Sequence, residues 1–104
     1  MKRPYVLTRS AEADLRDIVR YTLAQRGPQQ CEAYVASLEE RATALAQGQS
    51  PYKDMSSLLP GLRVAACGKH FIFCMPRPDA PALILAILHE RMDILARLKS
   101  RLSG

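Results

Sequence analysis

Cysteine is scarce in this sequence, with three residues: Cys31, Cys67 and Cys74. A small, odd number does not fit the disulfide framework of a small secreted protein. Residues 1–15 are basic at the start but contain no continuous apolar stretch, so they do not resemble a signal peptide. The longest apolar run, Ala82 to Leu88, is far shorter than the roughly 20 residues that span a bilayer. These absences predict a cytoplasmic protein that does not enter membranes.

Acidic residues are also in deficit, 10 against 15 basic ones, which gives a net charge of +5. The excess lies in residues 51–104, which carry eight basic and four acidic groups. This imbalance favours an anionic partner: a nucleic acid, a membrane surface or an acidic protein segment. With 48% hydrophobic and 24% charged residues in 104, the composition predicts one globular domain over residues 1–104.

The first half of the chain predicts a strand and two helices. Residues 5–8 are short, apolar and β-branched, which is typical of a strand. Thr8 or Ser10 can cap a first helix, whose apolar residues recur at helical spacing in residues 11–22. Gly27 and the proline after it end this helix and start the second. The short connection predicts an antiparallel helical hairpin.

A second helical stripe runs through residues 31–45 and ends at Gly48. Turn-rich residues 48–61 follow. The rest predicts three strands (62–67, 70–75 and 82–89), a hairpin turn at Gly68-Lys69, a proline-rich loop over 76–81 and a final short helix over 92–102. The expected fold is therefore α+β, a helical hairpin packed on a small antiparallel sheet, in the order β-α-α-β-β-β-α.

The predicted hairpin turn fixes which side chains share a face. Alternation places Val64, Ala66, Phe71 and Phe73 together, and we expect this face to pack on the helical hairpin. The opposite face would hold Arg63, Cys67, His70, Ile72 and Cys74. It is part polar and part apolar, so the last helix, a partner or both are expected to cover it.

Metal sites find little support. The stretch "HERMD", residues 89–93, lacks the second histidine of a helical zinc motif. His70 and Cys74 would lie roughly 13 Å apart on one strand, too far to share an ion. Cys67 and His70 could face each other across the turn, but no third group is placed to orient a base for nucleophilic catalysis. We expect no metal and no cofactor.

Cleavage of RNA is the catalytic reaction for which the chain has the most suitable residue types. These are Arg63, Lys69, His70, His89 and Arg91. The simpler interpretation is a basic recognition surface, or pairing of the arginines with Glu90 and Asp93. Helix-turn-helix, zinc-finger and aromatic-strand signatures are absent, so direct sequence-specific nucleic-acid binding is not expected.

Two patterns give the chain a resemblance to the ParE-type toxins of the ParE/RelE toxin–antitoxin superfamily. The pattern LT-x-x-A-x-x-DL-x-x-I-x-x-Y is met by Leu7, Thr8, Ala11, Asp14, Leu15, Ile18 and Tyr21. The pattern ILH-x-x-MD is met by Ile87, Leu88, His89, Met92 and Asp93. With the segment "PYKDMSSLLPGLRVAACGKHFIFCMP" between them, the resemblance covers essentially the whole chain.

The resemblance implies a toxin that inhibits DNA gyrase, is neutralised by a cognate ParD-like antitoxin, and serves plasmid stabilisation or stress responses. The related RelE branch instead cuts mRNA on the ribosome, often with a tyrosine after the last strand. Here residues 92–95 read Met-Asp-Ile-Leu, and the four tyrosines all lie earlier in the chain. This departure favours a non-catalytic toxin over a ribosome-dependent mRNA endonuclease, and a non-toxic interaction module stays open as a further alternative.

Contact with the target or the antitoxin is expected from basic and apolar residues of the second half. The candidates are Arg63, His70, His89, Arg91, Leu95, Arg97, Leu98 and Arg101. The last four lie on a basic, amphipathic final helix, which either contributes to toxicity or closes the core. A homodimer or a toxin–antitoxin hetero-oligomer is compatible with an open sheet face.

Overall fold

The computed structural model describes residues 4–103 and contains three helices and a five-stranded mixed sheet. The elements are β1 (Tyr5–Leu7), α1 (Arg9–Arg26), α2 (Pro28–Gln47), β2 (Lys53–Asp54), β3 (Arg63–Cys67), β4 (His70–Arg77), β5 (Ala80–His89) and α3 (Ile94–Ser103). The α+β prediction is confirmed, with one strand more than expected, the two-residue β2. Within residues 4–103, no helix combines the length and the apolar character needed to cross a membrane.

The helical hairpin begins, turns and ends at the capping and turn residues of the sequence. Thr8 is the N-cap of α1, and its side chain accepts a hydrogen bond from the Ala11 amide at 3.1 Å. Gly27, at φ 86°, joins the two helices, and Pro28 starts α2, where its missing N–H leaves no helical bond unmade. Gly48, in the left-handed conformation, ends α2. The four signals used for prediction are thus the physical causes of the helix ends.

The sheet has the strand order β1-β5-β4-β3-β2. β1 pairs with β5 in parallel, and the other three pairs are antiparallel. The predicted β3–β4 register is confirmed, from Cys67 opposite His70 to Arg63 opposite Cys74. Because α1 turns away after β1 ends, the edge of β5 beyond Ile84 faces helices instead of another strand.

The predicted loop over residues 76–81 is wrong. β4 continues to Arg77 and β5 starts at Ala80, which leaves a two-residue turn. A register shift between Met75 and Arg77 takes Pro76 out of the ladder, so its missing N–H costs no strand-to-strand bond. Proline density therefore marked an irregular hairpin end and not a separate loop.

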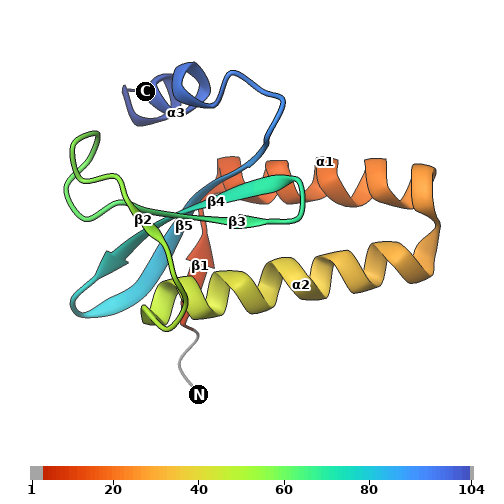
Figure 1. Cartoon of the computed structure of the whole chain (residues 1–104), viewed down its shortest axis with the longest axis horizontal. Helices are drawn as coiled ribbons and strands as arrows, with labels where there is room; N and C mark the ends of the chain where they lie inside the picture. The colour runs from red at the N-terminus through yellow and green to blue at the C-terminus, as the bar shows by residue number, and fades with distance from the viewer. Residues whose placement is uncertain (1–3, 104) are drawn as a thin grey trace.

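The two sheet faces are assigned the wrong way round by the sequence reasoning. The hairpin α1–α2 packs on the face that contains Ala65, Cys67, Ile72 and Cys74. Val64 and Phe73 lie on the opposite face, in a second cluster with Leu98 of α3. Small side chains let two long helices approach the sheet closely, and the larger ones fill the space under the single short helix. Figure 1 shows the resulting layers, with α3 on the far side of the sheet from α2.

Candidate functional site

A cleft of about 630 Å³ opens between α1, the β3–β4 turn and the end of β5. Ile18 and Tyr21 of α1 and Met92 after β5 supply its apolar lining. Tyr34, Lys69, His70, His89 and Arg91 supply its polar wall. Tyr21 is 68% exposed and Met92 41% exposed, so large apolar side chains stand at the rim. This combination suits an amphipathic partner segment.

Tyr34 of α2 is the centre of the polar wall. Its hydroxyl lies 3.1 Å from the Cys67 carbonyl, 3.3 Å from the Lys69 amide and 2.6 Å from Nδ1 of His70. A hydroxyl has one proton and two lone pairs. All three contacts are satisfied when it donates to Cys67 and accepts from Lys69 and from a protonated Nδ1 of His70. This assignment leaves Nε2 of neutral His70 as an acceptor.

In His89 the Nδ1 atom accepts a hydrogen bond instead of donating one. His89 lies directly across from His70 in the β4–β5 register, and the two rings meet edge to face with centroids 5.1 Å apart. Its Nδ1 accepts a hydrogen bond from the Arg91 amide at 3.0 Å, so neutral His89 carries its proton on Nε2. The two imidazoles that line the cleft therefore differ in tautomer: Nε2 of neutral His70 is an acceptor and Nε2 of neutral His89 is a donor.

Burial shapes the titration of this cluster. The pKa of His70 is lowered by burial, then by His89, while Glu90 and Asp14 oppose the shift. The pKa of the Tyr34 hydroxyl is raised by burial, against the Lys69 amide, which lowers it. Both groups are therefore held in their neutral forms near neutral pH.

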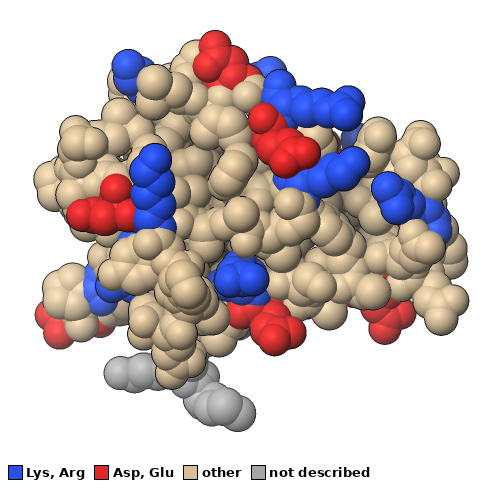
Figure 2. Space-filling view, in the orientation of Figure 1, with Lys and Arg blue, Asp and Glu red and all other residues tan. Residues whose placement is uncertain are grey.

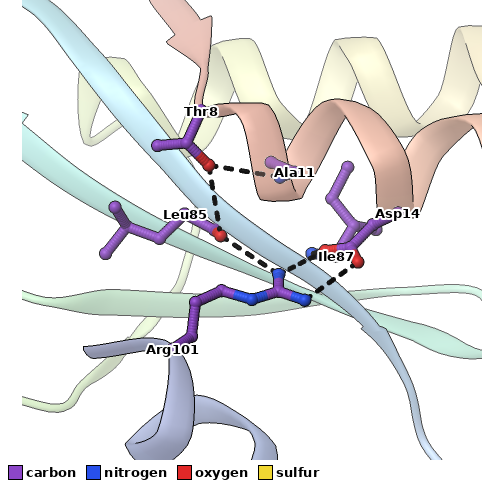
Figure 3. Close-up of polar contacts among 6 residues, drawn as sticks. All are labelled: Thr8, Ala11, Asp14, Leu85, Ile87 and Arg101. Atoms are coloured by element: carbon purple, nitrogen blue, oxygen red, sulfur yellow. Dashed lines mark hydrogen bonds and ion pairs between the residues drawn. The ribbon is translucent and has the colours of Figure 1, made fainter. Parts of the chain in front are cut away.

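A second polar group joins the two ends of the chain. Arg101 of α3 makes two hydrogen bonds to the Asp14 carboxylate of α1, at 2.6 and 3.1 Å. Asp14 also accepts the Ile87 amide at 2.9 Å, and Arg101 donates to the Leu85 carbonyl at 3.2 Å. Figure 3 shows both side chains lying along β5 just beyond β1. They satisfy the main-chain groups that a longer β1 would have paired with.

The structure separates the predicted site residues into three groups. His70, His89 and Arg91 meet in the cleft, and Leu95 and Arg97 are exposed on α3. Leu98 is fully buried and so is not a surface contact residue, whereas Arg63 and Arg101 are held by contacts within the chain and their role in partner binding stays a prediction. Leu98 is 0% exposed in the core, Arg101 holds Asp14, and Arg63 donates to the Leu45 carbonyl and stacks over the Tyr52 ring. The final helix thus closes the core with its inner face.

Sequence reasoning missed Tyr34 and Asp14 as site residues. Tyr34 was assigned to the apolar stripe of α2, and Asp14 was noted as an acidic residue of the first helical turn and as part of a family pattern. Both act through partners more than thirty residues away, so no local spacing marked them. The polar residue in an otherwise apolar helical stripe was the available signal for Tyr34.

Metal binding is not favoured by the arrangement of donors. Across residues 4–103, no three His, Cys, Asp or Glu side chains are grouped to hold an ion. His70 could bind one through Nε2, but Nδ1 of His89 accepts a hydrogen bond, which opposes the protonation state of a ligating imidazole. The three cysteines are buried and unpaired, and burial raises the pKa of Cys74 to about 11.

The surface does not concentrate its positive charge in one patch on the face of Figure 2. Lys and Arg side chains there are interspersed with Asp and Glu. The arrangement of charged side chains at each site, and not the net charge of +5, therefore decides which partner fits.

Comparison with known proteins adds sequence and fold relationships. Residues 5–94 match the family model described as the ParE toxin of the type II toxin–antitoxin system parDE. The chain is 54% identical to a curated Toxin ParE of Escherichia coli over 100 residues, which cover 96% of this chain and 97% of that protein. It is 31% identical to Toxin ParE1 of Caulobacter vibrioides over 96 residues, covering 92% and 98%.

A solved structure shares the fold. It is described as a chromosomal ParDE toxin–antitoxin system from P. aeruginosa and superposes with a TM-score of 0.66 at 22% identity. The match covers 82% of this chain and 92% of that one. At this identity the likeness concerns the arrangement of helices and strands.

Proposed function

The chain belongs to the ParE toxin family of type II toxin–antitoxin systems, and from this premise we propose that it inhibits DNA gyrase and is neutralised by a ParD-like antitoxin. The observation that carries the proposal is the 54% identity to a Toxin ParE over nearly the full length of both chains. Because gyrase acts on DNA inside the bacterial cell, the proposal places the toxin in the cytoplasm.

We propose the cleft as the antitoxin site. Exposed Tyr21 and Met92 offer apolar contact area, and Lys69 and Arg91 stand beside them. An antitoxin segment with apolar residues on one side and acidic residues on the other would bury the first and pair with the second. Such a segment would also shield Tyr21 from water, which is the most exposed large apolar side chain among the described residues.

The outer face of α3 is the proposed contact with gyrase. Leu95 is 51% exposed, and Arg97 and Lys99 are exposed beside it, whereas the inner face is occupied by Leu98. A basic helix with an exposed apolar residue in its first turn suits an anionic or mixed protein surface. This face and the cleft are made by different elements, so target and antitoxin would have separate contact residues.

Ribosome-dependent cleavage of mRNA is the second candidate, and one observation favours it. Tyr34 and His70 come within 2.6 Å, so a tyrosine and an imidazole meet without a tyrosine after the last strand. The hydroxyl proton of Tyr34 is already donated to the Cys67 carbonyl, and proton transfer from Tyr34 would lose this hydrogen bond and would have to overcome the burial that raises the Tyr34 pKa, which argues against catalysis. We therefore favour a non-catalytic inhibitor.

Two assays run in parallel test the proposal. Purified chain is added to gyrase with relaxed plasmid, and separately to a reconstituted translation reaction, each with and without its cognate antitoxin. Loss of supercoiling that the antitoxin reverses is the expected result. Cleaved mRNA with normal supercoiling would establish the endonuclease instead, and no effect in either assay would leave a non-toxic interaction module.

A further inference from the structure

The only two histidines of the chain form a pair in the wall of the cleft. His70 and His89 occupy opposite positions on β4 and β5, and their ring centroids are 5.1 Å apart at an interplanar angle of 88°. Both side chains are partly exposed. If binding in the cleft takes up or releases a proton near neutral pH, the group that titrates is one of these two imidazoles, whose rings are in contact with each other.

One ring nitrogen of each histidine is occupied by the protein itself. Nδ1 of His70 contacts the Tyr34 hydroxyl, and Nδ1 of His89 accepts the Arg91 amide. Among residues 4–103, neither Nε2 has a hydrogen-bond partner within the chain. The wall thus presents an acceptor from neutral His70 and a donor from neutral His89.

The charges around the pair favour an anionic group. Lys69 and Arg91 line the same wall. Of the acidic residues near it, Asp14 is paired with Arg101, Asp17 lines the cleft and lies 3.9 Å from Arg20 on exposed α1, and Glu90 follows His89 in the exposed turn. A ligand carboxylate could accept the Nε2–H of His89 directly, but it would meet only a lone pair on neutral His70. Addition of one proton to that lone pair removes the mismatch.

We propose that the partner segment that docks in this cleft inserts an acidic side chain against Nε2 of both histidines, and that docking takes up one proton from solvent onto His70. The inference rests on the proposed function, since it identifies the chemistry by which the antitoxin site recognises its partner. The proton moves from water to Nε2 of His70, and the resulting imidazolium forms a charge-assisted hydrogen bond to the carboxylate.

The groups around His70 act in both directions on its charge, and on balance they favour a neutral imidazole in the unbound chain. Tyr34 from α2 is neutral, Lys69 in the turn is cationic, and His89 on β5 lies against its ring. Glu90 and Asp14 favour protonation but do not dominate, and the pKa of His70 lies below its usual value. A carboxylate brought by the partner reverses this balance by adding an opposite charge at contact distance.

Calorimetry of the full chain with its cognate antitoxin tests the inference. Titrations at about pH 6.5 in two buffers of different ionisation heat report the protons exchanged on binding. We expect net uptake, with affinity up to about tenfold higher at pH 6 than at pH 8. His70→Asn keeps an amide N–H for Tyr34 but cannot titrate, so uptake should fall towards zero.

Two lysine variants locate the carboxylate. Lys69→Gln removes a charge from the cleft wall and should weaken binding severalfold. Lys53→Gln removes the same charge from exposed β2, outside the cleft, and should leave affinity unchanged. Equal effects of the two changes would overturn the proposed contact.

A pH titration of the histidine ring protons by NMR, in the free chain and in its complex with the antitoxin, measures the His70 pKa without any substitution. A higher pKa of His70 in the complex is expected. Tight binding with no proton uptake and no change at His70 would overturn this inference and leave the proposed function intact. Absence of antitoxin binding would overturn both.

Discussion

Arg101, near the C-terminal end of the chain, holds Asp14 of the first helix through two hydrogen bonds of 2.6 and 3.1 Å. Their side chains are only 24% and 14% exposed, so the pair is largely shielded from solvent. Together they complete the edge of β5 at Leu85 and Ile87. The contact therefore couples the docking of α3 to the integrity of the central strands.

Arg101→Met should lower the free energy of unfolding by about 1–2 kcal/mol, because Asp14 loses its charged partner and Leu85 loses a donor. Arg97→Met is the matched control, since Arg97 is exposed on the same helix, and its effect should stay within about 0.5 kcal/mol. Urea denaturation of both variants measures the difference. Equal destabilisation would show that the Asp14 contact contributes nothing specific.

Mild acid should destabilise the protein through His70. Its folded pKa is depressed by burial and by His89, so the unfolded state binds the proton more readily, and stability present above about pH 6.5 is lost as the pH falls towards the folded value. Thermal unfolding at a series of pH values measures this loss. His70→Asn should flatten the curve over that window. An unchanged slope in the variant would assign the acid sensitivity to other groups.

Gly68→Ala should be more damaging than Gly27→Ala. Both glycines have positive φ, 57° and 86°, so each alanine carries backbone strain, about 1–3 kcal/mol at Gly27, whose ψ of 171° lies in a region essentially confined to glycine. At Gly68 the new Cβ would also lie 2.6 Å from Cε1 of Tyr34, whereas nothing lies within 4 Å at Gly27. Tyr34 would have to leave the Lys69 amide and His70. Comparison of the two melting temperatures tests this. Similar values would mean that the Tyr34 side chain can move aside without lowering the free energy of unfolding.

The thiols should be inert in the folded protein. Cys31, Cys67 and Cys74 are all buried, and the pKa of Cys74 is raised to about 11 by burial despite Arg63, which lowers it. At pH 8 roughly a thousandth of such a thiol is thiolate, the reactive form. An aromatic disulfide reagent should therefore label the folded protein only at the rate at which the protein unfolds locally. In denaturant, all three thiols should react at once. A rapid native burst would contradict this.

Leu95→Ser should reduce gyrase inhibition while leaving the fold unchanged, because Leu95 is 51% exposed and the core residue of α3 is Leu98. The measurement is supercoiling activity against toxin concentration, beside a circular dichroism melt. Leu98→Ser is the contrasting variant and should unfold the helix, so a truncation of α3 would confuse stability with function. Full inhibition by Leu95→Ser would remove the outer face of α3 from the proposed gyrase contact.

The sequence by itself determined the first two helices, their ends and the central hairpin, and it placed the final helix to within two residues at its start. Thr8, Gly27, Pro28 and Gly48 act through main-chain geometry and hydrogen bonds within a few residues, and these effects are local. The Cys67–His70 register followed equally from a two-residue turn. The patterns around Asp14 and His89 also indicated the family.

Only the tertiary structure decided which sheet face lies under which helices, and which polar residues meet. Alternation along a strand divides side chains into two sets but does not say which set the helices cover, so Phe73 was placed on the wrong side. Arg101 was predicted only as a candidate contact with a partner, and the structure shows that it also holds Asp14, 87 positions away. Tyr34 met His70 from another element in the same manner. Such pairs depend on how the helices pack on the sheet, because distance along the chain carries no information about distance across the core.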